Sequence, residues 1–268
     1  MLHHRTGLLA LALLALPLAG IANAEELTAR EIMERVDARD DGDYATQDME
    51  MILIDKRGNQ RVRKLRSFAR DVGKDDQSIM FFLSPADVED TGFLTYDYDD
   101  PEKDDDQWLY LPALSRTKRI ASSDKSGSFM GSDFSYADMS DRPLDHYEYE
   151  LMGESEIDGV PVWQIQATPI TEREKDETGY EKQISFVRQD NYVVVRSVAW
   201  VKKGKRLKYF EVEDLEQIDG IWVATEMHMT TRKGKETLHK TVLYAKNVKF
   251  DQDLPEDLFS VRQLEKGP

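Results

Sequence analysis

The chain has 268 residues, no cysteine and a formal net charge of −16 at pH 7. The missing cysteine excludes disulfides and thiol chemistry. The acidic balance argues against binding to nucleic acid, which needs basic patches, and against adhesion to an anionic membrane surface. A chain of this length can bury a core that suffices without disulfides, and its acidity is explained most simply by solubility.

The first 24 residues have the pattern of a secretory signal peptide. Arg5 precedes an apolar run over residues 7–18, and Ala22-Asn23-Ala24 provides a small-residue cleavage site. The run is too short to cross a bilayer comfortably, and no cysteine follows it that would carry a lipid anchor. We expect residues 1–24 to be removed and residues 25–268 to be exported as one soluble domain.

Residues 28–38 form the one long amphipathic helix that the sequence predicts. Thr28 and Glu31 have the spacing of a capping box, and Ile32 and Val36 lie one turn apart on the same face. This helix precedes a chain in which strand signals dominate.

The strand signals are alternating apolar and polar residues and short apolar runs. They predict strands over residues 49–53, 60–68, 79–83, 108–111, 147–151, 163–167, 180–188 and 192–201. Turn signals at 202–205, 219–220 and 233–235 divide the remainder in the same way. We therefore predict a mainly β, antiparallel domain of about eleven strands. Because many strands carry charges on one face only, the sheet must cover its apolar face, and a half-open barrel around an apolar cavity does so.

A serine-rich segment, residues 122–141, interrupts the strand pattern. It carries five large apolar or aromatic side chains: Phe129, Met130, Phe134, Tyr136 and Met139. In one interpretation these side chains anchor a crossover loop to the core. In the other the segment is a lid hinged at Gly127 and Gly131, in which Ser132 or Asp133 caps a short helix through Met139. Methionine suits a surface that accepts varied chains.

No catalytic or metal-binding pattern is present in the sequence. The G-x-S-x-G pattern of a nucleophile elbow is missing, because Phe129 stands where the nucleophile should be. His146, His228 and His239 are too far apart in sequence to form a zinc motif, and the acidic run at 96–108 lacks the spacing of an EF-hand loop. We predict no catalytic residue, no metal site and no cofactor, and we do not expect an enzyme.

The run QWLYLPALSRTKRIASSDKSGSFMGSDFSYADM at residues 107–139 resembles the signature of the periplasmic outer-membrane lipoprotein-sorting proteins. That family is related in fold to the lipoprotein carrier LolA. The signal peptide, the N-terminal helix, the basic strand at 60–68 and the hairpins through Phe250 also fit, so the resemblance covers nearly the whole mature chain.

The resemblance implies a half-open antiparallel β-barrel of the LolA/LolB type with about eleven strands. An N-terminal helix and a short lid helix would cover an apolar cavity. It also implies a periplasmic protein that holds the acyl chains of a lipid or lipoprotein. The implied partners are an inner-membrane transporter of the RND/MMPL type and an outer-membrane acceptor.

Two groups of side chains are the predicted ligand contacts. The first is the five apolar or aromatic side chains of the serine-rich segment. The second would line the barrel and consists of Trp108, Tyr110, Trp163, Ile165 and Phe186. Core packing is the alternative for each barrel residue.

Three functions remain open from the sequence. The first is a carrier that moves acyl chains between the inner and outer membranes. The second is a non-transporting module of the same fold that senses lipids or proteins. The third is a lipid-modifying enzyme, which the missing nucleophile disfavours. The basic strand, with Arg61, Arg63, Lys64 and Arg66, is either a solvated face or a contact for lipid phosphates or an acidic partner.

Overall fold

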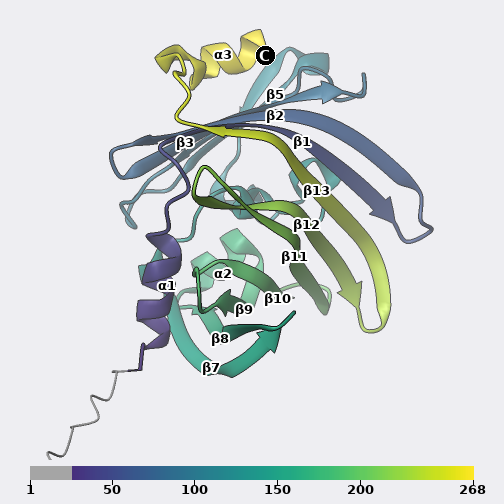
Figure 1. The fold of residues 1–268 in the computed structure, drawn as a ribbon. Coiled ribbons are helices and arrows are strands. Elements are labelled where there is room, and N and C mark those ends of the chain that lie inside the picture. Colours follow the sequence, from purple (N-terminus) through teal and green to yellow (C-terminus); the bar gives the residue numbers. More distant parts are fainter. Residues whose placement is uncertain (1–25) are drawn as a thin grey trace, which may run out of the picture.

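A computed structural model describes residues 26–268 and shows one antiparallel sheet of thirteen strands (Figure 1). The predicted signal peptide, residues 1–24, lies outside the described residues. The strands are β1 (Tyr44–Asp55), β2 (Gln60–Val72), β3 (Asp75–Ser84), β4 (Gly92–Asp97), β5 (Asp106–Leu111), β6 (Arg116–Arg119), β7 (Tyr147–Ile157), β8 (Val160–Pro169), β9 (Tyr180–Arg188), β10 (Val194–Val201), β11 (Arg206–Ile218), β12 (Ile221–Lys233) and β13 (Glu236–Phe250).

The sheet is open, as the half-open barrel prediction requires. The strand order is β6-β5-β4-β3-β2-β1-β13-β12-β11-β10-β9-β8-β7, so β6 and β7 are the two edges. The sequence did not single out β4 or β6, which accounts for thirteen strands where about eleven were predicted. Strand β6 is four residues long and carries the sequence Arg-Thr-Lys-Arg. A short, charged edge strand of this kind discourages pairing with another chain.

The centre of the sheet is built from the two ends of the described chain. Strands β1 to β6 step outward in one direction, and β7 to β13 return from the far edge to pair with β1. In the β1–β13 ladder, Met51 lies opposite Leu243 and Ile52 opposite Val242. The two halves of the sheet are therefore joined at this ladder.

The hairpin turns follow local turn chemistry. Strand β7 ends at Ile157 and β8 begins at Val160, which leaves Asp158 and Gly159 as a two-residue turn. Both have positive φ, 51° and 81°, as a type I′ turn requires, and Asp-Gly is among the pairs that favour this turn. Asp219 and Gly220 repeat the arrangement between β11 and β12, with φ of 50° and 93°.

In the part of the chain that the structure describes, three α-helices and six short 3-10 turns accompany the sheet. The α-helices are α1 (Ala29–Asp37), α2 (Glu172–Thr178) and α3 (Val261–Lys266). The 3-10 turns are η1 (Pro112–Leu114), η2 (Ser122–Asp124), η3 (Phe129–Gly131), η4 (Tyr136–Met139), η5 (Leu144–His146) and η6 (Glu256–Leu258). Helix α1 has the predicted capping box between Thr28 and Glu31. Within residues 26–268, no helix combines the length and the apolar character needed to cross a membrane.

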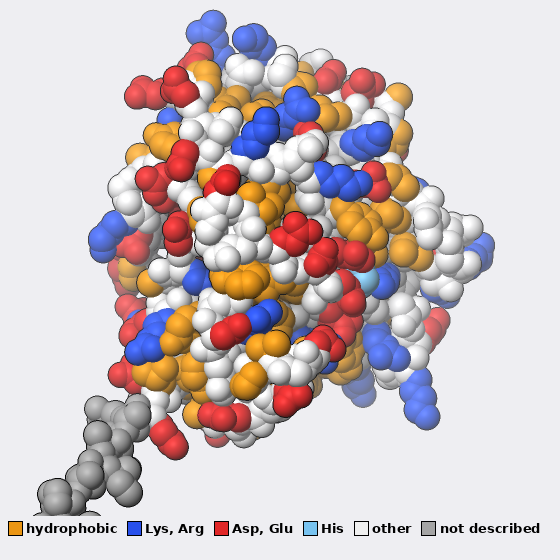
Figure 2. Space-filling model, in the orientation of Figure 1, with side chains coloured by type: hydrophobic (Ala, Val, Ile, Leu, Met, Phe, Trp, Pro, Cys, Tyr) orange, Lys and Arg blue, Asp and Glu red, His pale blue; other side chains and the backbone are white. Residues whose placement is uncertain are grey.

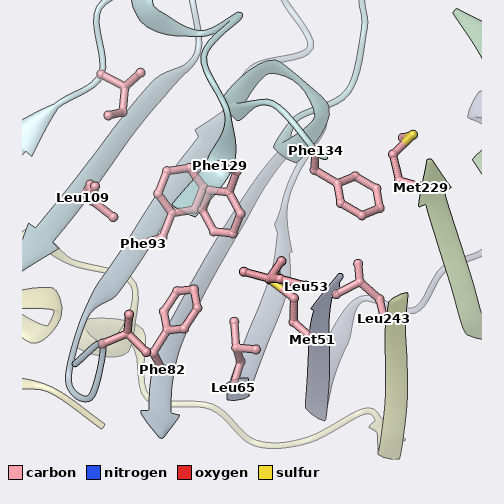
Figure 3. Close-up of a cluster of buried hydrophobic side chains, with 12 residues drawn as sticks. Met51, Leu53, Leu65, Phe82, Phe93, Leu109, Phe129, Phe134, Met229 and Leu243 are labelled. Atoms are coloured by element: carbon pink, nitrogen blue, oxygen red, sulfur yellow. The ribbon is translucent and has the colours of Figure 1, made fainter. Parts of the chain in front are cut away.

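The two faces of the sheet have separate cores. On the inner face, Phe82 and Phe93 pack against Phe129 of the serine-rich segment in the cluster drawn in Figure 3. On the outer face, Phe81 packs with Leu264 of α3, which contacts β4, β5 and β6 at the top of the view in Figure 1. Strands β3 to β5 are thus covered on both sides.

Candidate functional site

The serine-rich segment is a tight loop on the inner face, without the predicted helix. The backbone N–H of Phe129 donates to the carbonyl of Phe134 (2.8 Å), and the N–H of Tyr136 donates to that of Gly127 (3.0 Å). The loop reverses at Met130 and Gly131, which have positive φ of 49° and 76°. A methionine in this conformation is strained, so the surrounding contacts must hold it there.

The predicted cap at Ser132 or Asp133 is wrong. The only helical structure between residues 132 and 139 is the 3-10 turn η4, and Ser135 caps it in a capping box with Asp138. The side chain of Asp133 is instead used in contacts with strands β12 and β13. A single 3-10 turn satisfies fewer backbone groups than an α-helix, so the segment depends on such tertiary contacts.

The structure brings the segment's five apolar or aromatic side chains together on one core cluster. Phe129 is 1% exposed and Phe134 is 7% exposed, and Met130, Tyr136 and Met139 pack against the same cluster while partly exposed. The Phe129 ring meets Phe93 edge-on at 5.0 Å between centroids and Tyr136 at 5.6 Å. Edge-to-face pairs of this kind add to the stabilisation from burial.

Polar contacts at Asp133 and Met130 help to fix the segment to the sheet, together with the amide of Gln107 on β5, which donates to the carbonyl of Tyr136 (2.9 Å). The carboxylate of Asp133, whose side chain is 2% exposed, accepts from the hydroxyls of Thr231 (2.5 Å) and Thr241 (2.7 Å), and Nδ1 of His239 lies 2.6 Å from it. The Arg63 guanidinium donates to the carbonyl of Met130. Arg63 was left open as a solvated or ligand-binding residue, but it is buried and tethers the segment. Arg63 stands two residues before Leu65 and therefore shares its buried face of β2, and this alternation was the signal that the sequence offered.

A cavity of about 470 Å³ lies beside the segment, between α1 and the inner face of the C-terminal half of the sheet. Its apolar wall consists of Met33, Val36, Phe134, Tyr149, Val194, Ala199, Phe210 and Met229. Phe134 is the member of the segment's five apolar or aromatic side chains that reaches the cavity, and it points toward Met229 in Figure 3. A volume of this size falls within the range of about 300–1,000 Å³ that is usual for small-molecule sites.

A buried charged group forms the polar wall of the cavity. The Asp138 carboxylate accepts from Arg142 (2.9 Å), from the Tyr180 hydroxyl (2.9 Å) and from the backbone of Ser135 (2.8 Å), and Lys208 lies 3.5 Å away. Burial alone would raise the pKa of Asp138, but the charges of Lys208 and Arg142 outweigh it and hold that pKa below its usual value. Burial also lowers the pKa of Lys208. The cavity therefore has an apolar wall on one side and, on the other, a polar wall whose buried charges neutralise one another.

The barrel residues named from the sequence separate into two sets. Trp163 and Ile165 lie on the inner face, but in a cluster that α1 covers, and Ile165 is fully buried there. Trp108 and Tyr110 face the opposite way and pack in the outer core beneath α3, while Leu109 between them faces the segment. This corrects the predicted positions of Trp108 and Tyr110.

Phe186 is the fifth barrel residue, and it also faces outward. Its neighbours Ser185 and Val187 are buried on the inner face, so Phe186 alternates to the outer one. Because both faces of the sheet carry aromatic residues here, hydrophobicity alone did not reveal the inner face. The inner-facing aromatics that the sequence missed are Tyr147, Tyr149, Tyr180 and Phe210.

Comparison with known proteins places this architecture in a family. A family model described as an uncharacterized protein matches residues 74–266. A DUF1329 family protein from Desulfovibrio piger is similar to the chain, with 32% identity, a TM-score of 0.80, and coverage of 88% of this chain and 97% of that one. A domain from Vibrio parahaemolyticus named for outer-membrane lipoprotein sorting has 32% identity, a TM-score of 0.79, and coverage of 88% and 98%. The chain belongs to the DUF1329 family.

Another solved structure supports the fold of this LolA-like chain. A LolA superfamily protein from Nitrosomonas europaea shares 19% identity with it at a TM-score of 0.67, and the match covers 89% of this chain and all of that one. No curated protein sequence matches the chain. The resemblance inferred from residues 107–139 is thus confirmed at the level of the family.

An acidic cleft of about 380 Å³ lies outside the LolA-like cavity, next to α1 and the β2–β3 turn. Its carboxylates are Asp37, Asp41, Asp71, Asp76, Asp97, Asp99, Asp141 and Asp145. Burial, followed by the charges of Asp105 and Asp141, raises the pKa of Asp97 to about 8. Within residues 26–268, no group of three or more His, Asp or Glu side chains is arranged to hold a metal ion.

Asp97 should make the fold less stable at alkaline pH. Its pKa is about 8 in the folded chain and about 4 in an unfolded one, so the folded state binds the proton more tightly. That stabilisation is complete below about pH 4 and is lost as the pH rises through 8. We expect the free energy of unfolding, measured with urea, to fall by about 2–3 kcal/mol from this group between pH 6 and pH 9.

The variant Asp97→Asn should flatten that pH dependence, because the amide does not titrate. Asp87→Asn, in the exposed β3–β4 loop, is the matched control and should leave the dependence unchanged. An unchanged slope in Asp97→Asn would show that the alkaline destabilisation arises elsewhere.

Proposed function

We propose that this LolA-like chain is a periplasmic carrier that binds the acyl chains of a lipid or lipoprotein and transfers them between the inner and outer membranes. The observation that carries the proposal is the cavity of about 470 Å³ with its continuous apolar wall. Each methylene removed from water there contributes about 0.8 kcal/mol, so an acyl chain is held without a covalent step. A similar domain from Vibrio parahaemolyticus is named for outer-membrane lipoprotein sorting, which supports this class of cargo.

The cover that moves in this carrier is α1. The serine-rich segment is tied down by Asp133, Arg63 and its own buried Phe129, which favours the anchoring interpretation over a hinged lid. The polar contacts of helix α1 are with turns: Arg30 pairs with Asp145 of η5 (2.7 Å), and Arg35 donates to the Tyr192 hydroxyl between β9 and β10 (2.6 Å). Exposed contacts of this kind each stabilise by only about 0–1 kcal/mol. Lifting α1 would otherwise uncover two buried side chains, Ala29 and Ile32, so α1 is the easier cover to lift.

Loading and release need partners in this proposal. The family resemblance favours an inner-membrane transporter of the RND/MMPL type for loading and an outer-membrane acceptor for release.

Two observations favour a carrier over a lipid-modifying enzyme. Histidine is absent from the cavity lining of the described chain, and the carboxylate of Asp138 is engaged by cations. A nucleophile would need a free base beside it.

Filling the cavity tests the carrier function. Ala199 lies on the inner face of β10 and lines the cavity, so Ala199→Phe should reduce the bound lipid several-fold. Val198→Phe, on the other face of the same strand, places the same phenyl ring outside the cavity and should leave binding unchanged. The measurement is native mass spectrometry of protein purified gently from the periplasm, with organic extraction of any adduct.

Two results would overturn the proposal. One is a wild-type protein that stays at its apo mass after incubation with total membrane lipid, which would favour the non-transporting sensing module. The other is equal lipid retention in Ala199→Phe and wild type, with both variants folded by circular dichroism. Either result would remove the cavity as the lipid site.

A further inference from the structure

One side of this acidic protein, where three hairpin turns lie together, is basic; we call it the basic edge. The antiparallel order brings the β1–β2, β12–β13 and β10–β11 turns to the same side, since Asp55 pairs with His239 and Leu207 with Arg232. The basic side chains on this edge are Lys56, Arg57, Lys202, Lys203, Lys205, Arg206, Lys233 and Lys235. In Figure 2 several Lys and Arg side chains project from the lower right, where Figure 1 places the β12–β13 turn.

A pocket of about 450 Å³ opens on this basic edge. One wall is the serine-rich segment, which contributes the hydroxyl groups of Ser126, Ser128 and Ser132. The opposite wall is the C-terminal end of α2 with the β10–β11 turn, which contributes Lys203 and Arg206. The Ser128 hydroxyl already donates to the carbonyl of Ser132 (2.6 Å), and that of Ser132 donates to the carbonyl of Phe134 (3.4 Å). The Ser126 hydroxyl and the cations opposite are therefore the groups that could bind phosphate oxygens.

Some of the pocket's cations are already neutralised, and two are not. Lys202 donates to the carboxylates of Glu172 and Asp176, both at 2.9 Å. Within residues 26–268, Lys203 and Arg206 make no ion pair with a carboxylate, and the Arg206 Nε donates to the Lys203 carbonyl at 3.4 Å. These two uncompensated cations are available to an anion in the pocket.

The basic pocket and the apolar cavity share a wall. Tyr180 and Lys208 line both of them. The Lys208 ammonium donates to the Tyr180 hydroxyl (2.9 Å), and its side chain is 14% exposed. A molecule with an apolar chain in the cavity would therefore have its polar end beside Lys208, at the inner limit of the basic pocket.

We propose that the basic pocket binds a phosphate-type anion on the head group of the same ligand whose chain occupies the cavity. The proposal rests on the proposed function and deepens it, since it assigns the cargo an anionic head. Arg206 presents the planar fork that suits two phosphate oxygens, and Lys203 adds a mobile point charge. The pocket selects the head group, whereas the cavity holds the chain.

The test separates the head group from the chain. Isothermal titration of the delipidated mature protein at low ionic strength compares palmitoyl lysophosphatidate, monopalmitoylglycerol and inorganic phosphate. Lys203→Glu/Arg206→Glu should lower the affinity for lysophosphatidate at least about tenfold, because charge-assisted contacts are lost. It should leave the affinity for monopalmitoylglycerol unchanged. Lys56→Glu/Lys235→Glu has the same net charge but lies outside the pocket, and should change lysophosphatidate binding by less than about threefold. Lys203→Gln/Arg206→Gln serves if the Glu variant does not fold.

Each remaining outcome has a distinct meaning. Equal affinity of wild type for the two lipids would overturn the head-group site while leaving the carrier in place. Binding of neither lipid would overturn the carrier function itself. Inorganic phosphate that binds as tightly as lysophosphatidate would show a free-phosphate site unconnected with the cavity. If the pocket variant and its charge-matched control lose the same affinity for lysophosphatidate, the effect comes from the overall charge of the protein and not from the pocket. That result would also overturn the proposal.

Discussion

Replacing Phe129 with alanine should lower the free energy of unfolding by about 3–5 kcal/mol, the range for a large aromatic side chain removed from a core. The side chain is 1% exposed and contacts the rings of Phe93, Tyr136 and Phe82. The strained backbone at Met130 leaves the loop little freedom to collapse into the space. The buried ring of Phe129 thus anchors the serine-rich segment to the inner core.

Urea unfolding followed by circular dichroism measures this loss. Leu114→Ala is the control, because Leu114 is 67% exposed on a neighbouring turn and its truncation should change stability by less than about 0.5 kcal/mol. A Phe129→Ala protein within about 1 kcal/mol of wild type would mean that the segment is loosely packed, as a lid would be.

Replacing Asp133 with alanine should release the segment from strands β12 and β13. The hydroxyls of Thr231 and Thr241 would lose their buried acceptor, and His239 would lose its partner, at a total of about 2–4 kcal/mol. The loss is expected to be local, since the strands have their own ladder. The amides of Phe129 and Tyr136 should then exchange with solvent much faster than those of β12.

Hydrogen exchange with mass spectrometry distinguishes this local release from global destabilisation. Asp124→Ala, which removes an exposed ion pair with Lys118 at 2.9 Å, is the matched control and should cost no more than about 1 kcal/mol. Uniformly faster exchange over the sheet and the segment would contradict a tethering role for Asp133. Unchanged exchange in the segment would assign the tether to its other contacts with the sheet, those of Arg63, Gln107, Tyr180 and Lys208.

The strands and hairpin turns were predictable because the sequence patterns that indicate them are local. Strand β9 has the predicted bounds, 180–188, and the Asp219-Gly220 turn stands where the sequence placed it. Turn chemistry and period-two alternation act over a few residues, so no tertiary information is needed to find them. The capping box at Thr28 was predictable for the same reason.

The facing of the strands and the path of the serine-rich segment were not predictable in the same way. In β5, Trp108 and Tyr110 are as apolar as Leu109, because α3 covers one face and the segment covers the other. When both faces of a strand are buried, the pattern of apolar residues does not show which side chains point to the inner face of the sheet. The segment's shape depends on Asp133 reaching residues about a hundred positions away, a contact that no local pattern contains.

The pairing of β1 with β13 sets the order in which the chain becomes a folded protein. Strand β1 is the first strand of the described chain, and its second neighbour, β13, is the last. Until the two strands pair, the hydrogen-bonding groups along that side of β1 have no native partner and are a template for wrong pairing. Ladders between segments so far apart in sequence form slowly, so we expect the two halves of the sheet to join late in folding. A chain that exposes an unpaired strand for that time is one that a chaperone has time to hold.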